Sequence, residues 1–140
     1  MRTALRQEVI DFARTWLGTR WRHQGRTKGY GVDCIGLIVG VARELNLSLF
    51  DTTQYTPVPD GVRLRAQCDE LMTPLNSPLL GSVVLMQFKG PPQHLGFFSR
   101  QNGVDTLIHA YVVDRRVVEH PIDQQWRDRF VAFYDIPGVI

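Results

Sequence analysis

The stretch from Gly31 to Val41 constrains the fold more than any other part of the chain. A turn containing Gly31 leads to Cys34, and the residues from Cys34 to about Leu45 are mostly apolar or glycine. A helix with this pattern leaves few polar faces, so other elements must cover it on most sides. Gly36 and Gly40 lie four residues apart on one side of it, which predicts a close approach by another element. We therefore expect a central, buried helix that begins at the cysteine.

Helical and strand patterns occupy different parts of the chain. Apolar residues recur at three- and four-residue steps from about 3 to 17, which predicts an amphipathic helix ended by Gly18. A flexible loop is expected over 25–32, an irregular connection over 49–60 and a shorter helix over about 62–72. Strand-forming runs then follow at Val83–Phe88, Leu95–Ser99, Thr106–Tyr111, Arg116–Glu119 and Phe130–Tyr134. Helices followed by consecutive strands predict an α+β fold with an antiparallel sheet.

Size and composition limit the classes of protein to which the chain can belong. Its 140 residues, 44% of them hydrophobic, suit one core and not two, so we expect a single domain over residues 1–140. The net charge is only +2 and the arginines are scattered, which argues against a nucleic-acid partner. No apolar run approaches the roughly 20 residues of a membrane span. The first residues do not resemble a secretory signal, so we expect synthesis in the cytoplasm without a signal peptide.

Cys34 is the candidate nucleophile. The N–H groups and dipole at a helix start favour a thiolate, which is the form that attacks a carbonyl carbon. Asp33, directly before it, is expected to cap the helix. The alternative for Cys34 is a small buried core residue. Cys68 is expected to be a buried structural residue, because a bridge between the two cysteines would consume the nucleophile.

Two downstream histidines are candidates for the base that a cysteine nucleophile needs. His94 stands at the expected start of a strand, and His109 lies within the next strand. Neighbouring strands of a hairpin would bring the two rings together, so that His109 holds the tautomer of His94. The alternative for His109 is a buried histidine bonded to backbone. His120 is expected to be a surface residue.

A zinc site is the competing interpretation of the same residues. Cys34, His94 and His109 could ligate zinc with His23 as a fourth ligand. Structural zinc sites usually contain ligands in close pairs, whereas these residues stand singly along the chain. The pattern therefore favours nucleophilic catalysis, which requires neither a metal nor a cofactor.

Three ordered motifs resemble a known family. The order Asp33-Cys34-x-Gly36-Leu37, then His94-Leu95-Gly96, then Ile108-His109-Ala110 resembles the NlpC-type cell-wall peptidases, which are papain-like cysteine enzymes that cut peptidoglycan stem peptides. The segments 17–25 and 121–137 are similar to the compact phage and gene-transfer-agent branch of that family. The resemblance covers nearly the whole chain.

The resemblance implies a papain-like single domain, with the nucleophile at a helix start packed on a five- to six-stranded antiparallel sheet. It implies a catalytic Cys34, His94 and His109 and a thioester acyl-enzyme. The implied partners are a peptidoglycan peptide and phage tail proteins, with the virion tail carrying the enzyme to the cell wall. The scissile bond implied is the one after D-glutamate, between its side chain and a diamino acid.

Substrate contacts and the oxyanion donors are less sharply specified. The backbone N–H of Cys34 is the first expected oxyanion donor. Trp21, a candidate for substrate binding, stands where many relatives have tyrosine, and its indole N–H could donate in place of a phenolic hydroxyl as the second oxyanion donor. His23 is a candidate for binding substrate or for replacing that donor, and the alternative is an ordinary exposed loop residue. Tyr111 is a candidate for lining the cleft or an ordinary strand residue.

Two alternatives to the peptidase remain at the level of sequence. One is a non-catalytic tail-tip assembly protein that has kept the fold and lost turnover. The other is an amidase or acyltransferase that uses the same cysteine on a different acyl group.

Overall fold

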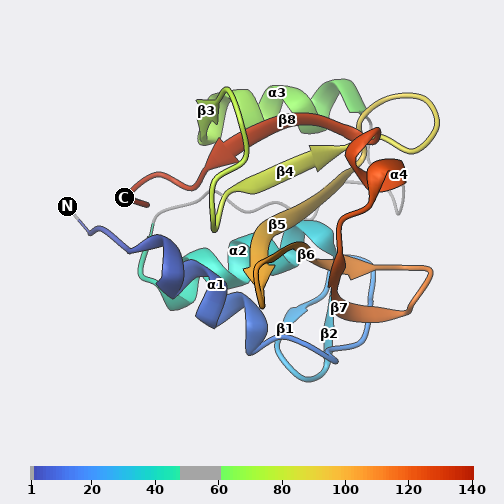
Figure 1. The fold of residues 1–140 in the computed structure, drawn as a ribbon. Coiled ribbons are helices and arrows are strands. Elements are labelled where there is room, and N and C mark those ends of the chain that lie inside the picture. The colour runs from blue at the N-terminus through green and yellow to red at the C-terminus, as the bar shows by residue number, and fades with distance from the viewer. Residues whose placement is uncertain (1, 48–60) are drawn as a thin grey trace.

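The arrangement of helices before strands that the sequence predicts is present in the computed structural model, which describes residues 2–47 and 61–140 (Figure 1). Four helices lie within this described part of the chain. They are α1 (Arg6–Arg14), α2 (Cys34–Glu44), α3 (Gly61–Leu71) and the short α4 (Gln124–Arg127). None of them has both the length and the apolar character that crossing a membrane requires. The connection expected over 49–60 lies outside the described residues.

The strands form an antiparallel sheet of six. In spatial order they are β3 (Thr73–Leu75), β8 (Phe130–Asp135), β4 (Val83–Met86), β5 (His94–Gln101), β6 (Val104–Tyr111) and β7 (Arg116–Pro121). Every neighbouring pair in this order is antiparallel. The five strands expected from the sequence are all present, and the α+β prediction with an antiparallel sheet is confirmed.

Four short elements were not predicted. The expected flexible loop before the cysteine contains a small hairpin of β1 (Arg26–Thr27) and β2 (Gly31–Val32). Gly29 reverses the chain between these strands with a φ of +82°, a conformation that glycine adopts without strain. The others are β3, which contains Pro74 at the edge of the sheet, and α4, which is too short for a helical period to be visible in the sequence.

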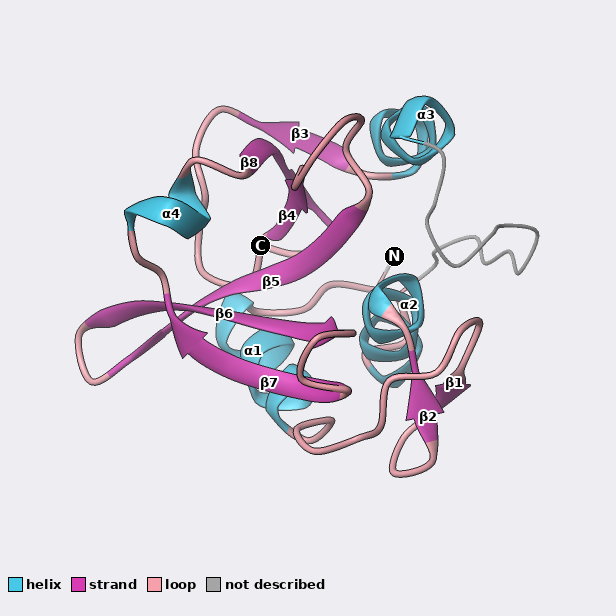
Figure 2. Ribbon diagram, turned by 90° about the vertical axis from the view of Figure 1, so that its right-hand side faces the viewer, coloured by secondary structure: helices cyan, strands magenta, loops and turns pink. Residues whose placement is uncertain are grey.

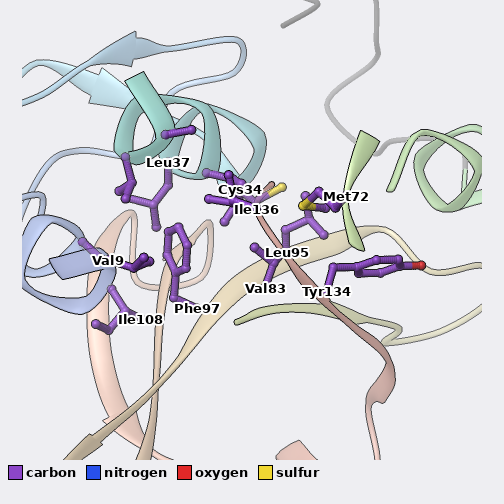
Figure 3. Packing of buried hydrophobic residues seen from close by; sticks show 14 of the residues in the cluster. Val9, Cys34, Leu37, Met72, Val83, Leu95, Phe97, Ile108, Tyr134 and Ile136 are labelled. Carbon is purple, nitrogen blue, oxygen red and sulfur yellow. The ribbon is translucent and has the colours of Figure 1, made fainter. Parts of the chain in front are cut away.

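Helix α2 is the buried centre that its composition predicts. Its residues Leu37, Val41 and Ala42 are fully buried, and the helix packs against α1, β5 and β6. Figure 2 shows α1 behind β6 and β7 and α2 at the side of the sheet, with the β1–β2 hairpin beside α2. Figure 3 shows Leu37 and Cys34 of this helix in the same cluster as Phe97 and Leu95 of β5. The start of α2 is thereby fixed against the first residues of β5.

The two glycines of α2 allow the close approach expected from their spacing. A side chain at Gly40 would collide with the ring of Trp16, and one at Gly36 would collide with the carbonyl oxygen of Gly25. Gly40 therefore admits the N-terminal helical segment, while Gly36 admits the loop that precedes the cysteine. Both contacts involve groups that cannot move easily, an aromatic ring and a backbone carbonyl.

The sheet separates two apolar clusters. Leu95 and Phe97 of β5 belong to the larger cluster, on the side of α1 and α2. Phe98 belongs to the smaller cluster, which also receives Leu107 of β6 and the edge of Trp126 from α4. Because side chains alternate along a strand, His94 shares the second face with Phe98, and His109 shares it with Leu107. The histidine face is therefore the one away from α2.

We predict that Gly40→Ala lowers the free energy of unfolding by about 2 kcal/mol, because the added methyl group overpacks the contact with Trp16. Helix propensity alone would favour alanine over glycine by about 1 kcal/mol, so the sign of the change in the free energy of unfolding shows which of the two effects is larger. The measurement is urea denaturation of Gly40→Ala, Trp16→Leu and the double variant. The double variant should lose at least about 1 kcal/mol less than the sum of the single losses. Additive losses would contradict the contact.

Candidate active site

The start of α2 is held by Asp33. Its carboxylate accepts a hydrogen bond from the backbone N–H of Gly36 at 2.8 Å, so the predicted helix cap is confirmed. The same carboxylate accepts from the N–H of Gln24 at 2.8 Å and from the Arg26 guanidinium at 3.0 Å. The side chains of Asp33 and Arg26 are both largely buried, so this pair resists solvent screening. Asp33 thus ties the loop that precedes the helix to the first turn of α2, which contains Cys34.

Cys34 is the first residue of α2, and only 8% of its surface is exposed. Its sulfur interacts with the backbone N–H groups of Leu95, Ile35 and Cys34 itself, which favour the thiolate. Burial outweighs them and, together with the Asp33 charge, raises the pKa of the Cys34 thiol to about 12. The N–H groups at the helix start favour the thiolate as expected, but in the resting protein burial outweighs them and the sulfur remains a thiol. The dehydration of the sulfur is larger than the effect of the helix end.

His94 and His109 meet as the sequence predicts. The Nε2 atom of His94 lies 2.6 Å from Nδ1 of His109, and the two rings meet edge to face at 4.9 Å. Gly96 lies beside this pair, where a Cβ atom would come within 3.0 Å of the His109 Cβ. The absence of a side chain at Gly96 therefore leaves room for the His109 ring beside β5.

Both imidazoles are neutral at physiological pH. His94 is 8% exposed, and burial lowers its pKa to about 3. His109 has no exposed surface, and burial, followed by the proximity of His94 and His120, lowers its pKa well below the usual value. A neutral His94 retains one unprotonated nitrogen, which is the state that a general base needs.

The thiol and the base are neighbours but do not touch directly. Within residues 2–47 and 61–140, the structure contains no hydrogen bond between the Cys34 sulfur and the His94 ring. The sulfur instead meets the N–H of Leu95, the residue that follows His94. Strand alternation accounts for this, because Leu95 faces α2 and His94 faces the opposite side. The structure brings His94 and His109 together. It places Cys34 of α2 against Leu95, the residue that follows His94 in β5.

His120, which the sequence predicts to be a surface residue, is partly buried and is a third member of the histidine row. Its Nε2 atom lies 2.8 Å from Nε2 of His109, and its ring packs at 4.8 Å on Trp126 of α4. Val118 pairs with His109 across β6 and β7, so His120, two residues further, lies on the same face. The register of the β6–β7 hairpin is what places His120 beside His109, and the sequence alone does not define that register.

The three candidate substrate-binding residues occupy different surroundings. Tyr111 stacks on His109 at 4.9 Å and contacts Phe88 and Trp126, in an aromatic cluster against the histidine row. Trp21 is partly buried against the main core, and its backbone N–H donates to Arg115. His23 is partly exposed and directly precedes Gln24, which binds Asp33. Tyr111 therefore contacts the histidines, while the other two belong to the loop before α2.

Cys68 lies in α3 and is 3% exposed. Burial raises the pKa of its thiol to about 12, and the nearby Asp69 and Cys34 act in the same direction. Both cysteines are free thiols in the structure. Among the residues that the structure describes, no three His, Cys, Asp or Glu side chains are arranged to hold a metal ion.

Comparison with known proteins identifies the family that the chain matches and solved structures that share its fold. The model of the NlpC/P60 family matches residues 18–135. No curated protein sequence matches the chain.

Solved structures share the fold at low sequence identity. A NlpC/P60 family protein from Bacillus cereus superposes with a TM-score of 0.70 and 15% identity, covering 96% of this chain and 41% of its own. The present chain therefore spans about two fifths of that longer protein. The NlpC/p60 domain of the peptidoglycan hydrolase SagA gives a TM-score of 0.61 and 14% identity, with 93% and 97% covered. An N-acetylmuramoyl-L-alanine amidase from Bacteroides uniformis gives 0.58 and 11%, with 92% and 96% covered.

We predict that resting Cys34 shows no thiolate below about pH 9, because burial raises the pKa of its thiol to about 12. The measurement is a pH titration of ultraviolet absorbance near 240 nm, taken as the difference between the native protein and Cys34→Ala. Subtraction removes the contribution of Cys68, which both proteins contain. A thiolate step between about pH 4 and pH 8 that disappears in Cys34→Ala would contradict the prediction.

Proposed function

The chain belongs to the NlpC/P60 family, and we propose that it is a cysteine peptidase that hydrolyses an amide bond in peptidoglycan stem peptides. The observation that supports this most strongly is the hydrogen bond between Nε2 of His94 and Nδ1 of His109, one residue from the contact between Cys34 and Leu95. A base whose far nitrogen is already occupied can turn only its other nitrogen toward a thiol. Members of the family include cysteine peptidases and amidases that act on peptidoglycan.

In the proposed reaction, the Cys34 side chain turns from the N–H of Leu95 toward Nδ1 of His94 when substrate binds. His94 takes the thiol proton as the sulfur attacks the substrate carbonyl carbon. The carbonyl oxygen becomes an oxyanion, for which the backbone N–H of Cys34 is a donor at the start of α2. His109 keeps the ring of His94 oriented while that ring carries the extra proton.

The acyl-enzyme then forms and is hydrolysed in two steps, and His94 carries the proton in each. His94 gives its proton to the leaving nitrogen, the carbon–nitrogen bond breaks, and a thioester remains on Cys34. His94 next removes a proton from water, whose oxygen attacks the thioester carbonyl carbon. The carbon–sulfur bond breaks, the proton returns to sulfur, and a carboxylic acid leaves.

Burial of the site explains why the resting groups are neutral. With the pKa of the thiol raised to about 12 and that of His94 lowered to about 3, a proton stays on sulfur until substrate arrives. A buried sulfur is also protected from oxidants, because the thiolate is the form that reacts with them. The thiolate is therefore generated during the attack and is not stored.

The finer assignments extend this proposal. We infer that Tyr111 contacts substrate beside the histidines, and that Trp21 and His23 do so from the loop tied to Asp33. The proposed scissile bond is the one after D-glutamate, joining its side chain to a diamino acid. The proposed carrier is a phage or prophage tail, which would deliver the enzyme to the cell wall.

An amidase is the second candidate, and a specific observation favours it. The chain shares its fold with an N-acetylmuramoyl-L-alanine amidase over 92% of its length. The same cysteine and histidines could release the stem peptide from the sugar instead of cutting within the peptide. The two activities leave different ends on their products.

We predict that the purified protein releases peptides from sacculi and that Cys34→Ala lowers the rate at least about 1,000-fold, because no other side chain replaces the attacking sulfur. Mass spectrometry of the products identifies the broken bond. A free carboxyl group on D-glutamate marks the peptidase, whereas a free lactyl carboxyl group marks the amidase. The matched control is Cys68→Ala, which removes the other buried thiol and should retain activity within about threefold.

Equal digestion by the native protein and Cys34→Ala would remove Cys34 from the mechanism. A native protein that releases no product from sacculi would instead support the non-catalytic assembly protein.

A further inference from the structure

We propose that His120 is a positioning residue that sets which nitrogen of His94 is free to act as a base. This inference rests on the proposed function, because it assigns a role to His94 in that reaction. The observation that carries it is an unbroken row of hydrogen bonds from His94 through His109 and His120 to a backbone carbonyl. Family resemblance assigns no role to His120, and the sequence placed it on the surface.

The row has three links of normal hydrogen-bond length. Nε2 of His94 lies 2.6 Å from Nδ1 of His109, and Nε2 of His109 lies 2.8 Å from Nε2 of His120. Nδ1 of His120 lies 2.8 Å from the carbonyl oxygen of Pro121. His94 therefore uses one ring nitrogen in the row, whereas His109 and His120 each use both.

The carbonyl at the end of the row determines the direction of every link. A carbonyl oxygen only accepts, so Nδ1 of His120 carries a proton and donates it to Pro121. A neutral His120 then has a bare Nε2, which accepts from Nε2–H of His109. Neutral His109 in turn has a bare Nδ1, which accepts from Nε2–H of His94. Nδ1 of His94 is left with a lone pair and no proton.

This direction is the productive one for the proposed reaction. Only the nitrogen of His94 that His109 does not contact can receive the proton of Cys34. If His120 donated to His109, both links would reverse and His94 would carry its proton on Nδ1, where it could not accept another. His120 and the carbonyl of Pro121 thus determine which nitrogen of His94 carries the proton, and therefore whether His94 can act as a base, without touching the thiol.

The surroundings of His120 hold it in this role. Its ring packs on Trp126 of α4, whose own ring also meets His109 at 5.2 Å. Asp123 caps α4 by accepting from the backbone N–H of Trp126 at 2.9 Å, which fixes the tryptophan next to the row. The neighbouring Glu119 is engaged by Arg14 and Thr106 on the opposite face of β7. His120 also borders a surface hollow of about 700 Å³, through which its ring can be reached.

The test is nitrogen-15 NMR of the histidine rings at neutral pH, first on the native protein without substrate. Couplings from ring carbons to nitrogen report which nitrogen is protonated. We expect a proton on Nε2 of His94, on Nε2 of His109 and on Nδ1 of His120. A native protein with the His94 proton on Nδ1 would overturn the proposal, and this readout depends neither on a variant nor on activity.

Two matched variants then separate positioning from packing. His120→Phe keeps a ring against Trp126 but offers no acceptor, so His94 should become a mixture of both tautomers. His120→Gln restores an amide oxygen that can accept from His109, so it should return His94 to the Nε2–H form. A native-like tautomer in His120→Phe would overturn the proposal.

Kinetics with soluble muropeptides give the second readout. His120→Phe should lower kcat about tenfold with KM changed less than about twofold, and His120→Gln should recover to within about threefold of the native kcat. Unchanged kcat in His120→Phe would overturn the role of His120 while leaving the proposed peptidase intact. Expected tautomers in a native protein that turns over no muropeptide would instead uphold the row and overturn the proposed function.

Discussion

The hydrogen bond between His94 and His109 is the interaction on which the rest of the site depends. It joins the first residue of β5 to the C-terminal half of β6 at 2.6 Å in a region with almost no solvent. It forms because the hairpin register places both side chains on one face and because Gly96 leaves room between them. Without it, His94 would be a buried histidine with two equivalent nitrogens. With it, Nε2 of His94 is occupied and Nδ1 is the nitrogen that remains to act as a base.

Burial sets the electrostatic character of this site. The start of α2, capped by Asp33, offers backbone N–H groups to a negative charge, but the dehydrated sulfur remains a thiol. The same dehydration keeps His94 neutral and therefore able to accept a proton. In such a dry environment each hydrogen bond is stronger than in water, and an unpaired polar group is costly. The histidine row ends on the carbonyl of Pro121, so each ring nitrogen within it has a partner except Nδ1 of His94, which is left to act as a base.

The sequence predicted the parts of the site that local patterns determine. The apolar run after Cys34 predicted α2, Asp33 predicted its cap, and strand alternation predicted that His94 and His109 would meet. It did not predict the place of His120 in the row, because His109 and His120 are 11 positions apart, with a turn between them whose register only the folded hairpin defines. It predicted that the helix start favours the thiolate but not the burial that outweighs this effect, because the burial of Cys34 depends on elements far along the chain, β5 above all.

The most direct test of the central claim is to capture the acyl group on the enzyme. Native protein is mixed with a soluble stem peptide, quenched in acid within a single turnover, digested and mapped by mass spectrometry. The account predicts one acyl adduct on Cys34 as a thioester that hydroxylamine removes, and none in Cys34→Ala. Product formation with no adduct on Cys34, or with an adduct on another residue, would contradict it.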